Sequence, residues 1–67
     1  MPQFYVTSEN SEDTFDSTNN LPDAIRIAKE LARNGQAGDP VCVEQEGKNI
    51  RIFVLMPNGT VAEQAIA

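Results

Sequence analysis

The sequence contains no histidine, no tryptophan and a single cysteine among its 67 residues. Without histidine, the chain lacks the side chain that most often serves as a general base or as a metal ligand near neutral pH. One cysteine cannot form an internal disulfide, and it cannot supply a cysteine cluster for zinc. We therefore expect no metal centre and no cofactor, and the cysteine usage is typical of a reducing compartment.

Basic residues are also scarce, with five Lys and Arg against ten Asp and Glu, for a formal net charge of −5. Nucleic-acid affinity comes mostly from cations that neutralise phosphates, so a nucleic acid is not the expected partner. The same charge disfavours an anionic membrane surface. No apolar run is long enough to span a bilayer, and the first residues lack the apolar core of a signal peptide, so we expect a cytoplasmic protein with no membrane contact.

The motifs of the common enzyme classes are missing as well. There is no nucleophile–base–acid triad, no phosphate-binding loop and no G-x-G-x-x-G sequence. The acidic residues fall in predicted loops, turns and exposed strand positions, where no apolar pocket would prepare them for acid–base catalysis. The sequence therefore predicts that the protein is not an enzyme.

The chain does contain enough apolar residues, 40%, for one small domain spanning residues 1–67. β-Branched residues and turn signals predict three consecutive strands over residues 41–46, 49–56 and 61–66. Gly47 stands at the centre of the first turn and Asn58-Gly59 at the centre of the second, where a positive φ is tolerated. Two successive β-hairpins sharing one long middle strand follow from this pattern.

If both hairpin loops have two residues, the register is fixed. Val43 then lies opposite Ile52, Cys42 opposite Phe53, and Glu44 opposite Arg51. In the second hairpin Met56 lies opposite Val61. This register predicts a core face formed by Val41, Val43, Ile50, Ile52, Val54, Met56 and Val61. The other face, called the mixed face here, is predicted to carry Cys42, Glu44, Arg51, Phe53, Leu55, Ala62 and Ile66.

The N-terminal third is less regular. Residues 4–9 read as a strand with Phe4 and Val6 toward the core and Tyr5 and Thr7 on the mixed face. Residues 9–20 are polar, and we favour a loop there, with a short strand over residues 13–17 as the alternative. The pattern leaves open whether the first strand runs parallel or antiparallel to its neighbour.

A helix over residues 21–33 carries the strongest signal of all. Asn20 is a suitable N-cap, Pro22 is tolerated in the first turn, and Gly35 follows as a stop. One apolar stripe follows the helical period and consists of Leu21, Ala24, Ile25, Ala28, Leu31 and Ala32, with Ile27 on its flank. The predicted fold class is α+β, with two layers, one helix packed on a mostly antiparallel sheet of three or four strands, in the order β-(β)-α-β-β-β.

One helix covers only one side of a sheet, so the mixed face is left without a partner inside the chain. We therefore expect a small protein-interaction module that binds a protein partner or a second copy of itself, as a homodimer, through that face. An isolated strand cysteine is usually a small apolar filler, and this is the simpler interpretation of Cys42. The predicted partner-binding residues are Tyr5, Cys42, Glu44, Arg51, Phe53 and Leu55.

Two other functions stay open. Arg26, Lys29 and Arg33 share one side of the helix, which would suit weak binding of a nucleic acid or a phosphate ligand. The acidic segment 9–16 lacks the spacing and glycine of a calcium loop, but it would suit an inhibitor that occupies a basic cleft. The arrangement is similar to that of many small bacterial or phage proteins, without a shared motif.

Overall fold

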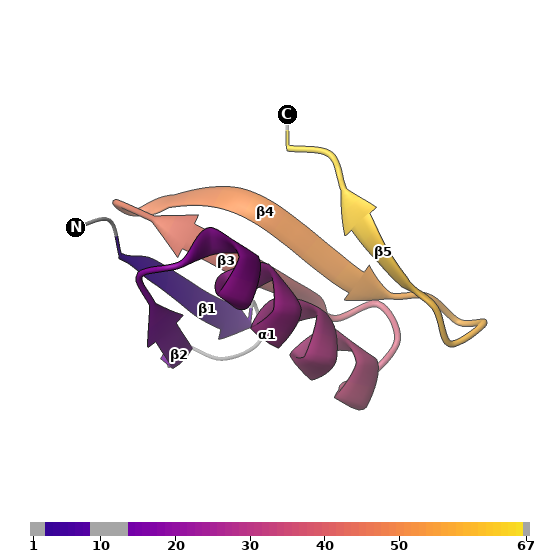
Figure 1. Ribbon diagram of the computed structural model, residues 1–67. Coiled ribbons are helices and arrows are strands. Elements are labelled where there is room, and N and C mark those ends of the chain that lie inside the picture. The colour runs from indigo at the N-terminus through magenta and orange to yellow at the C-terminus, as the bar shows by residue number, and fades with distance from the viewer. Residues whose placement is uncertain (1–2, 9–13, 67) are drawn as a thin grey trace.

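The computed structural model describes residues 3–8 and 14–66 and contains one helix and five strands within them (Figure 1). The chain is an α+β protein, as predicted, with α1 lying against one side of an antiparallel sheet. In chain order, the elements are β1 (Phe4–Ser8), β2 (Thr14–Thr18), α1 (Leu21–Asn34), β3 (Pro40–Gln45), β4 (Lys48–Leu55) and β5 (Val61–Gln64).

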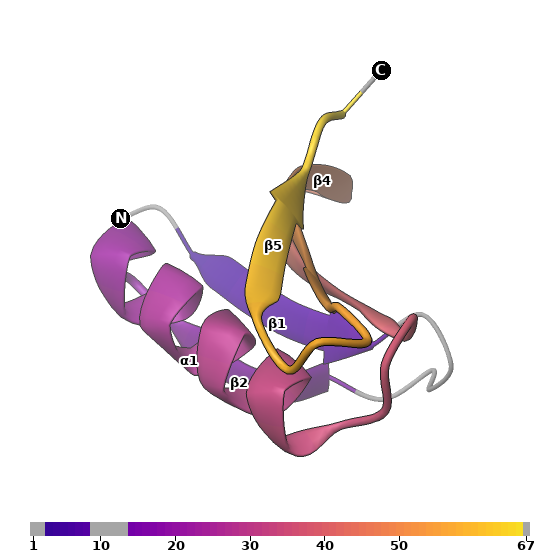
Figure 2. The same ribbon diagram turned by 90° about the vertical axis from the view of Figure 1, so that its right-hand side faces the viewer.

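The sheet has five strands in the spatial order β2-β1-β3-β4-β5, one more than the largest number predicted. All four strand pairs are antiparallel, including β1 with β3, which the sequence left open. The sheet twists strongly, and Figure 2 shows β5 rising steeply across the direction of β1 and away from α1. The helix consequently packs mainly on β1, β3 and β4, and least on β5.

β2 corrects the preference for a loop before the helix. Residues 14–18 pair with β1, with Phe4 opposite Thr18 and Tyr5 opposite Ser17. The strand carries Thr-Phe-Asp-Ser-Thr, which has only one apolar residue and therefore gives a weak periodic signal. An edge strand needs partner backbone groups on only one side, so the pairing with β1 is sufficient to define it.

α1 begins at the predicted residue, Leu21, and ends one residue later than predicted, at Asn34. The Asn20 side chain accepts a hydrogen bond from the Asp23 N–H at 3.3 Å, which satisfies one of the free donors of the first turn. At the other end the Gly35 N–H donates to the Ala32 carbonyl at 3.2 Å. Both ends are therefore determined by residues within or next to the helix.

Small side chains form the contact between α1 and the sheet. Ala24, Ala28 and Ala32 follow one another at four-residue spacing and are at most 1% exposed. Alanine has no atoms beyond Cβ, so this stripe lets the helix axis approach the strands closely. The rest of the core cluster comes from β1, β3 and β4 and consists of Phe4, Val6, Val41, Val43 and Phe53.

The predicted register of the first hairpin was wrong by one residue. Val41 lies opposite Phe53, and Cys42 lies opposite Ile52. The loop is Glu46-Gly47, with φ of 54° and 79°, a turn with positive φ at both loop positions that favours glycine in the second. After the pair Glu44–Asn49 the register shifts, because Ile50 is an extra residue that forms a β-bulge in β4.

The second hairpin also departs from a two-residue loop. The Met56 N–H donates to the Thr60 carbonyl at 2.7 Å, and the Gly59 N–H donates to the Met56 carbonyl at 2.9 Å. Residues 57–59 therefore form a three-residue loop, with Gly59 at a φ of +89°. A two-residue loop would require a ladder hydrogen bond from the backbone nitrogen of Pro57, which has no hydrogen.

The bulge reverses the two sides of β4 relative to the prediction, and the longer loop keeps Val61 of β5 on the helix side, as predicted. Ile52 and Val54, predicted for the core face, point to the side away from α1, and Phe53 and Leu55 point to the helix side. Met56, also predicted for the core, is 40% exposed beyond the end of β4. The observed arrangement places Phe53 and Leu55 on the helix side in place of Ile52 and Val54, whereas Val61 lies on the helix side as predicted. Phe53 and Leu55 are the larger side chains, so the same contact with α1 buries more apolar surface.

Candidate interaction surfaces

The predicted partner-binding residues do not form one surface. Tyr5, Cys42 and Glu44 lie on the side of the sheet away from α1, which we call the open side. The reversal of β4 places the other three on the helix side, and these are Arg51, Phe53 and Leu55. The mixed face, as predicted, was therefore wrong for the residues that come from β4.

Phe53 shows the consequence most clearly. Its side chain is 1% exposed and belongs to the core cluster beneath α1. A ring at this depth cannot touch a partner without unfolding of the helix from the sheet. Its sequence signal was ambiguous because β4 is apolar on both sides, so alternation could not decide which side faces the core.

The open side instead receives two apolar residues that were predicted for the core face, next to Ala62, which was predicted for this side. Ile52 and Val54 come from β4, and Ala62 lies opposite Val54 on β5. Ile52 and Ala62 are half-buried, and Tyr5, two strands away from β4, is 41% exposed. Ile52, Val54 and Ala62 form an apolar patch on β4 and β5, whereas Tyr5 on β1 lies between Ser17 and Glu44.

The centre of the open side is already shielded from water. Cys42 is 7% exposed and Val54 is 6% exposed, although neither belongs to the core cluster under α1. Both residues therefore offer little surface to a partner. Cys42 therefore has the position of a small apolar filler.

Charge is distributed unequally between the two sides of the sheet. Among the described strand residues, Glu44 is the one charged side chain that the pairing places on the open side. On the helix side, the Arg51 guanidinium forms an ion pair with Glu63 at 2.8 Å. The open side is thus nearly uncharged in a chain of which 22% is charged residues.

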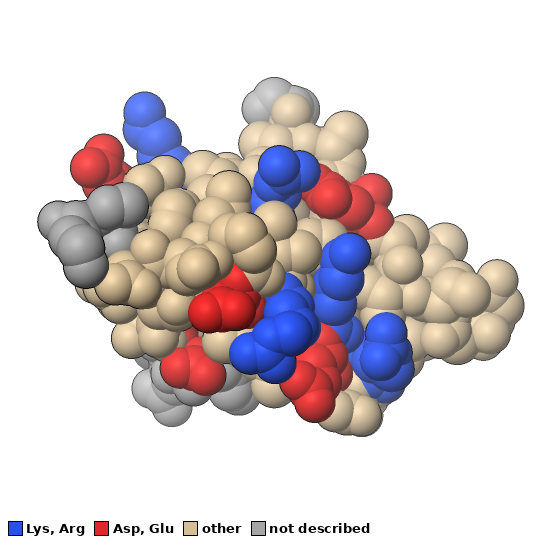
Figure 3. All heavy atoms as spheres, in the orientation of Figure 1, with Lys and Arg blue, Asp and Glu red and all other residues tan. Residues whose placement is uncertain are grey.

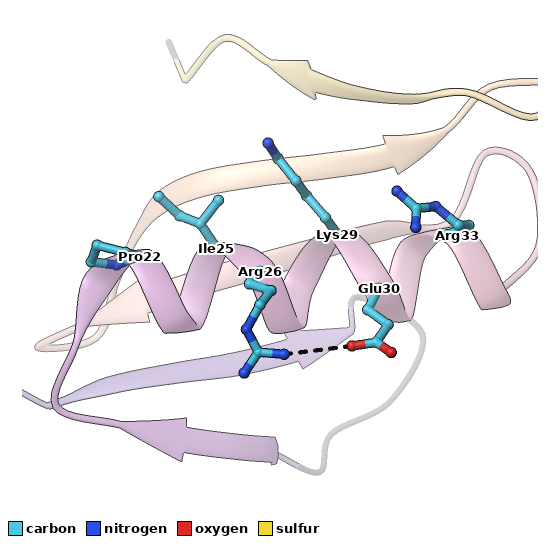
Figure 4. Close-up of a pocket in the computed structure, with 6 residues that line it drawn as sticks. All are labelled: Pro22, Ile25, Arg26, Lys29, Glu30 and Arg33. Carbon is cyan, nitrogen blue, oxygen red and sulfur yellow. Dashed lines mark ion pairs between the residues drawn. The ribbon is translucent and has the colours of Figure 1, made fainter.

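The outer side of α1 carries the basic stripe that the sequence indicated. The Arg26 guanidinium lies 3.8 Å from the Glu30 carboxylate, and both side chains are exposed. The Lys29 ammonium lies 5.6 Å from the centre of the Phe53 ring. Figure 4 shows Lys29 and Arg33 projecting toward the β4 side of the helix, whereas Arg26 and Glu30 project from its opposite side.

An open groove runs along the outer side of α1. It is open to solvent, has a volume of about 420 Å³, and is lined by Pro22, Ile25, Arg26, Lys29, Glu30 and Arg33, all from α1. In the space-filling view, Lys and Arg side chains gather in a band across the middle of this face, with Asp and Glu along its borders (Figure 3). We call the four residues Pro22, Ile25, Lys29 and Arg33 the cationic groove.

The acidic segment 9–16 can be described only in part, because residues 9–13 lie outside the described residues. At its end Asp16 is exposed, and its carboxylate accepts a hydrogen bond from the Ser17 N–H at 2.8 Å. This bond is local to the strand. It gives the predicted inhibitory role no further support.

The described residues contain no group of three or more acidic, histidine or cysteine side chains placed to bind a metal ion. Within the same residues, the core contains no buried polar or charged side chain. A helix long and apolar enough to cross a bilayer is likewise absent from them. The two surfaces above are therefore the features on which a function can be argued.

Comparisons with protein families, with curated proteins and with solved structures found no match for this chain.

Proposed function

We propose that the protein is a small interaction module whose open side binds a second copy of the same chain. The observation that carries the proposal is the composition of that side, where Tyr5, Ile52 and Ala62 supply exposed or half-buried apolar surface and Glu44 is the single charge. The fold supplies one helix in the described residues, and it covers the other side. Burial of this surface against another apolar surface is favourable in water.

The charge of the chain supports a second copy as the occupant. Two molecules of formal net charge −5 repel each other, so they can associate only where few acidic side chains meet. The nearly uncharged open side is such a place, whereas the outer side of α1 and the helix side of β5 are not, because Glu30 and Glu63 are exposed there. The open side is also self-complementary, since an apolar surface pairs with its own copy.

The size of the sheet limits the strength of this association. Five strands spaced about 4.8 Å apart and about five residues long give an area of roughly 300–400 Å² in projection. Stable interfaces bury about 800 Å² on each partner, so the predicted dimer belongs to the weak class. We therefore expect an equilibrium between monomer and dimer rather than a permanent dimer.

The test is the solution mass by light scattering or sedimentation in reducing buffer, over roughly 10 μM to 1 mM, where weak dimers dissociate. The wild-type mass should rise toward that of a dimer at the upper end. Ala62→Lys and Ile52→Lys should each keep the chain monomeric, because a lysine on the open side would be desolvated in the dimer. Both variants lower the net negative charge, so greater repulsion cannot explain a loss of association.

Gln36→Lys is the matched control. Gln36 is exposed in the connection between α1 and β3, so this variant adds the same charge away from the open side and should dimerise like the wild type. Thermal unfolding of each variant verifies that the fold is retained. A wild-type chain that stays monomeric at 1 mM, or a dimer that Ala62→Lys and Ile52→Lys leave intact, would contradict the proposal.

A further inference from the structure

The cationic groove on α1 lies on the opposite side of the molecule from the open side and suggests a second, independent binding site. Of the three cations on the helix, Arg26 pairs with Glu30 at 3.8 Å. The described residues supply no ion pair to Lys29 or Arg33, and both side chains project to the same side of α1 (Figure 4). We propose that the groove binds a small organic phosphate, with its phosphate group held between Lys29 and Arg33.

The spacing of the two cations fits one phosphate group. Lys29 and Arg33 are four residues apart, which is about 6 Å along a helix axis, so their long side chains can converge on one anion. The Arg33 guanidinium can donate two parallel hydrogen bonds to phosphate oxygens, and the Lys29 ammonium adds a compact positive charge. Two cations on adjacent turns thus present complementary donors to the same ligand.

The Phe53 ring favours one position of the Lys29 side chain. The ammonium lies 5.6 Å from the ring centre, within the range of a cation–π interaction, and the ring itself is fixed in the core. A lysine restrained in this way loses less conformational freedom when it binds an anion. The buried position of Phe53, which removes it from any partner surface, here contributes to a binding site.

One end of the groove is apolar, and the Arg26–Glu30 ion pair lines its edge. Pro22 and Ile25 line the apolar end on the N-terminal side of Lys29, and the whole groove has a volume of about 420 Å³. This volume lies within the range of small-molecule sites. A ligand with a phosphate group at one end and an apolar or aromatic body at the other would contact both parts.

The surrounding charges favour a small ligand over a nucleic acid. Glu30 borders the groove, and the chain has a formal net charge of −5, so an extended polyanion would pass over acidic residues. At physiological salt, charges beyond about 8 Å are largely screened, so a single phosphate group responds mainly to Lys29 and Arg33. Arg33 lies in the last turn, where the helix dipole opposes an anion, and we therefore expect a dissociation constant of about 0.1–1 mM.

The test is a titration of the ¹⁵N-labelled chain with phenyl phosphate and, separately, with inorganic phosphate, followed by amide chemical shifts. Phenyl phosphate should cause saturable amide shifts over residues 23–33 and bind more tightly than inorganic phosphate, because its ring contacts Pro22 and Ile25. Arg33→Gln should weaken phenyl phosphate binding about tenfold, the loss expected for a charge-assisted hydrogen-bonded contact. Lys29→Gln should have a similar effect.

Lys48→Gln is the matched control, because it removes one positive charge from an exposed residue of β4 that does not line the groove. It should leave the affinity unchanged. Equal losses in Lys48→Gln and Arg33→Gln would show a general charge effect and overturn the proposal, as would the largest shifts lying away from α1 and Phe53, or the absence of saturation. Ala62→Lys, which tests the open side, should not remove the titration response of α1, so the two proposals can fail separately.

Discussion

Val41 and Phe53 lie opposite each other across β3 and β4, and both side chains face α1. This one pair determines which side of β4 belongs to the core. It places Phe53 beneath the helix, against the alanine stripe, and turns Ile52 and Val54 to the open side. The stability of the fold and the composition of the candidate interaction surface both depend on it.

Truncation of the Phe53 side chain should therefore strongly destabilise the fold. Phe53→Ala removes a ring that is 1% exposed and leaves a cavity under α1, so we expect a loss of about 3–5 kcal/mol in the free energy of unfolding. Urea denaturation measures this loss. Ile52→Ala is the comparison, since Ile52 is half-buried on the open side and should cost clearly less. The opposite ranking would contradict the observed register.

The close approach of α1 to the sheet should make Ala28 intolerant of larger side chains. Ala28 is 0% exposed and lies at the centre of the alanine stripe. Ala28→Leu should force the helix away from the strands and lower the free energy of unfolding by about 1–3 kcal/mol. Glu30→Leu, at an exposed position on the same helix, should change it by less than about 0.5 kcal/mol. Equal effects in urea denaturation would argue against close helix–sheet packing.

The N-cap of α1 can be tested by itself. Asn20→Ala removes the acceptor for the Asp23 N–H and should cost about 1 kcal/mol of stability. Asn19→Ala changes the same residue type at the preceding exposed position and should have little effect. Thermal unfolding of the two variants side by side measures the difference. Identical melting temperatures would mean that the cap does not contribute.

The second hairpin requires glycine at position 59. At a φ of +89° an L-residue is strained, although a Cβ there would meet no other atom within 4 Å. Gly59→Ala should therefore destabilise the protein by about 1 kcal/mol through the backbone alone. Gly59→Asn should lose less, because asparagine tolerates positive φ better than alanine. An alanine variant as stable as the wild type would show that the loop adopts another conformation.

The two ion pairs should contribute little to the stability of the fold, and by unequal amounts. Arg51 and Glu63 join neighbouring strands at 2.8 Å and are each less than half exposed, whereas Arg26 and Glu30 are 3.8 Å apart and about two-thirds exposed. A double-mutant cycle with alanine should give a coupling energy of about 0.5–1 kcal/mol for the first pair and about 0.3 kcal/mol for the second. Both coupling energies should decrease as salt is added. For the Arg26–Glu30 pair, whose charges are 3.8 Å apart, coupling that is unchanged at 1 M salt, where charges are screened beyond about 3 Å, would contradict this.

Local chemistry made the helix predictable. Asn20, Pro22 and Gly35 mark its ends, and the buried alanines lie on the predicted stripe. The prediction that Phe4, Val6, Val41 and Val43 face the core was also correct. These apolar residues alternate along β1 and β3, and the pairing of the two strands brings all four to the same side of the sheet. The preferred prediction for the segment before the helix was a loop, which missed β2. The pairing of β2 with β1 is a contact between segments and not a property of Thr14–Thr18 alone.

The sequence by itself determined the α+β class, the order of the elements and the presence of two hairpins, because these depend on local propensity, capping and turn residues. Only the tertiary structure decided which side of β4 faces the helix. β4 is apolar on both sides, and the bulge at Ile50 directs Phe53 toward α1, whereas the three-residue loop after Met56 keeps Val61 on that same side. A shift of one residue costs nothing in local propensity, yet it exchanges the core with the surface.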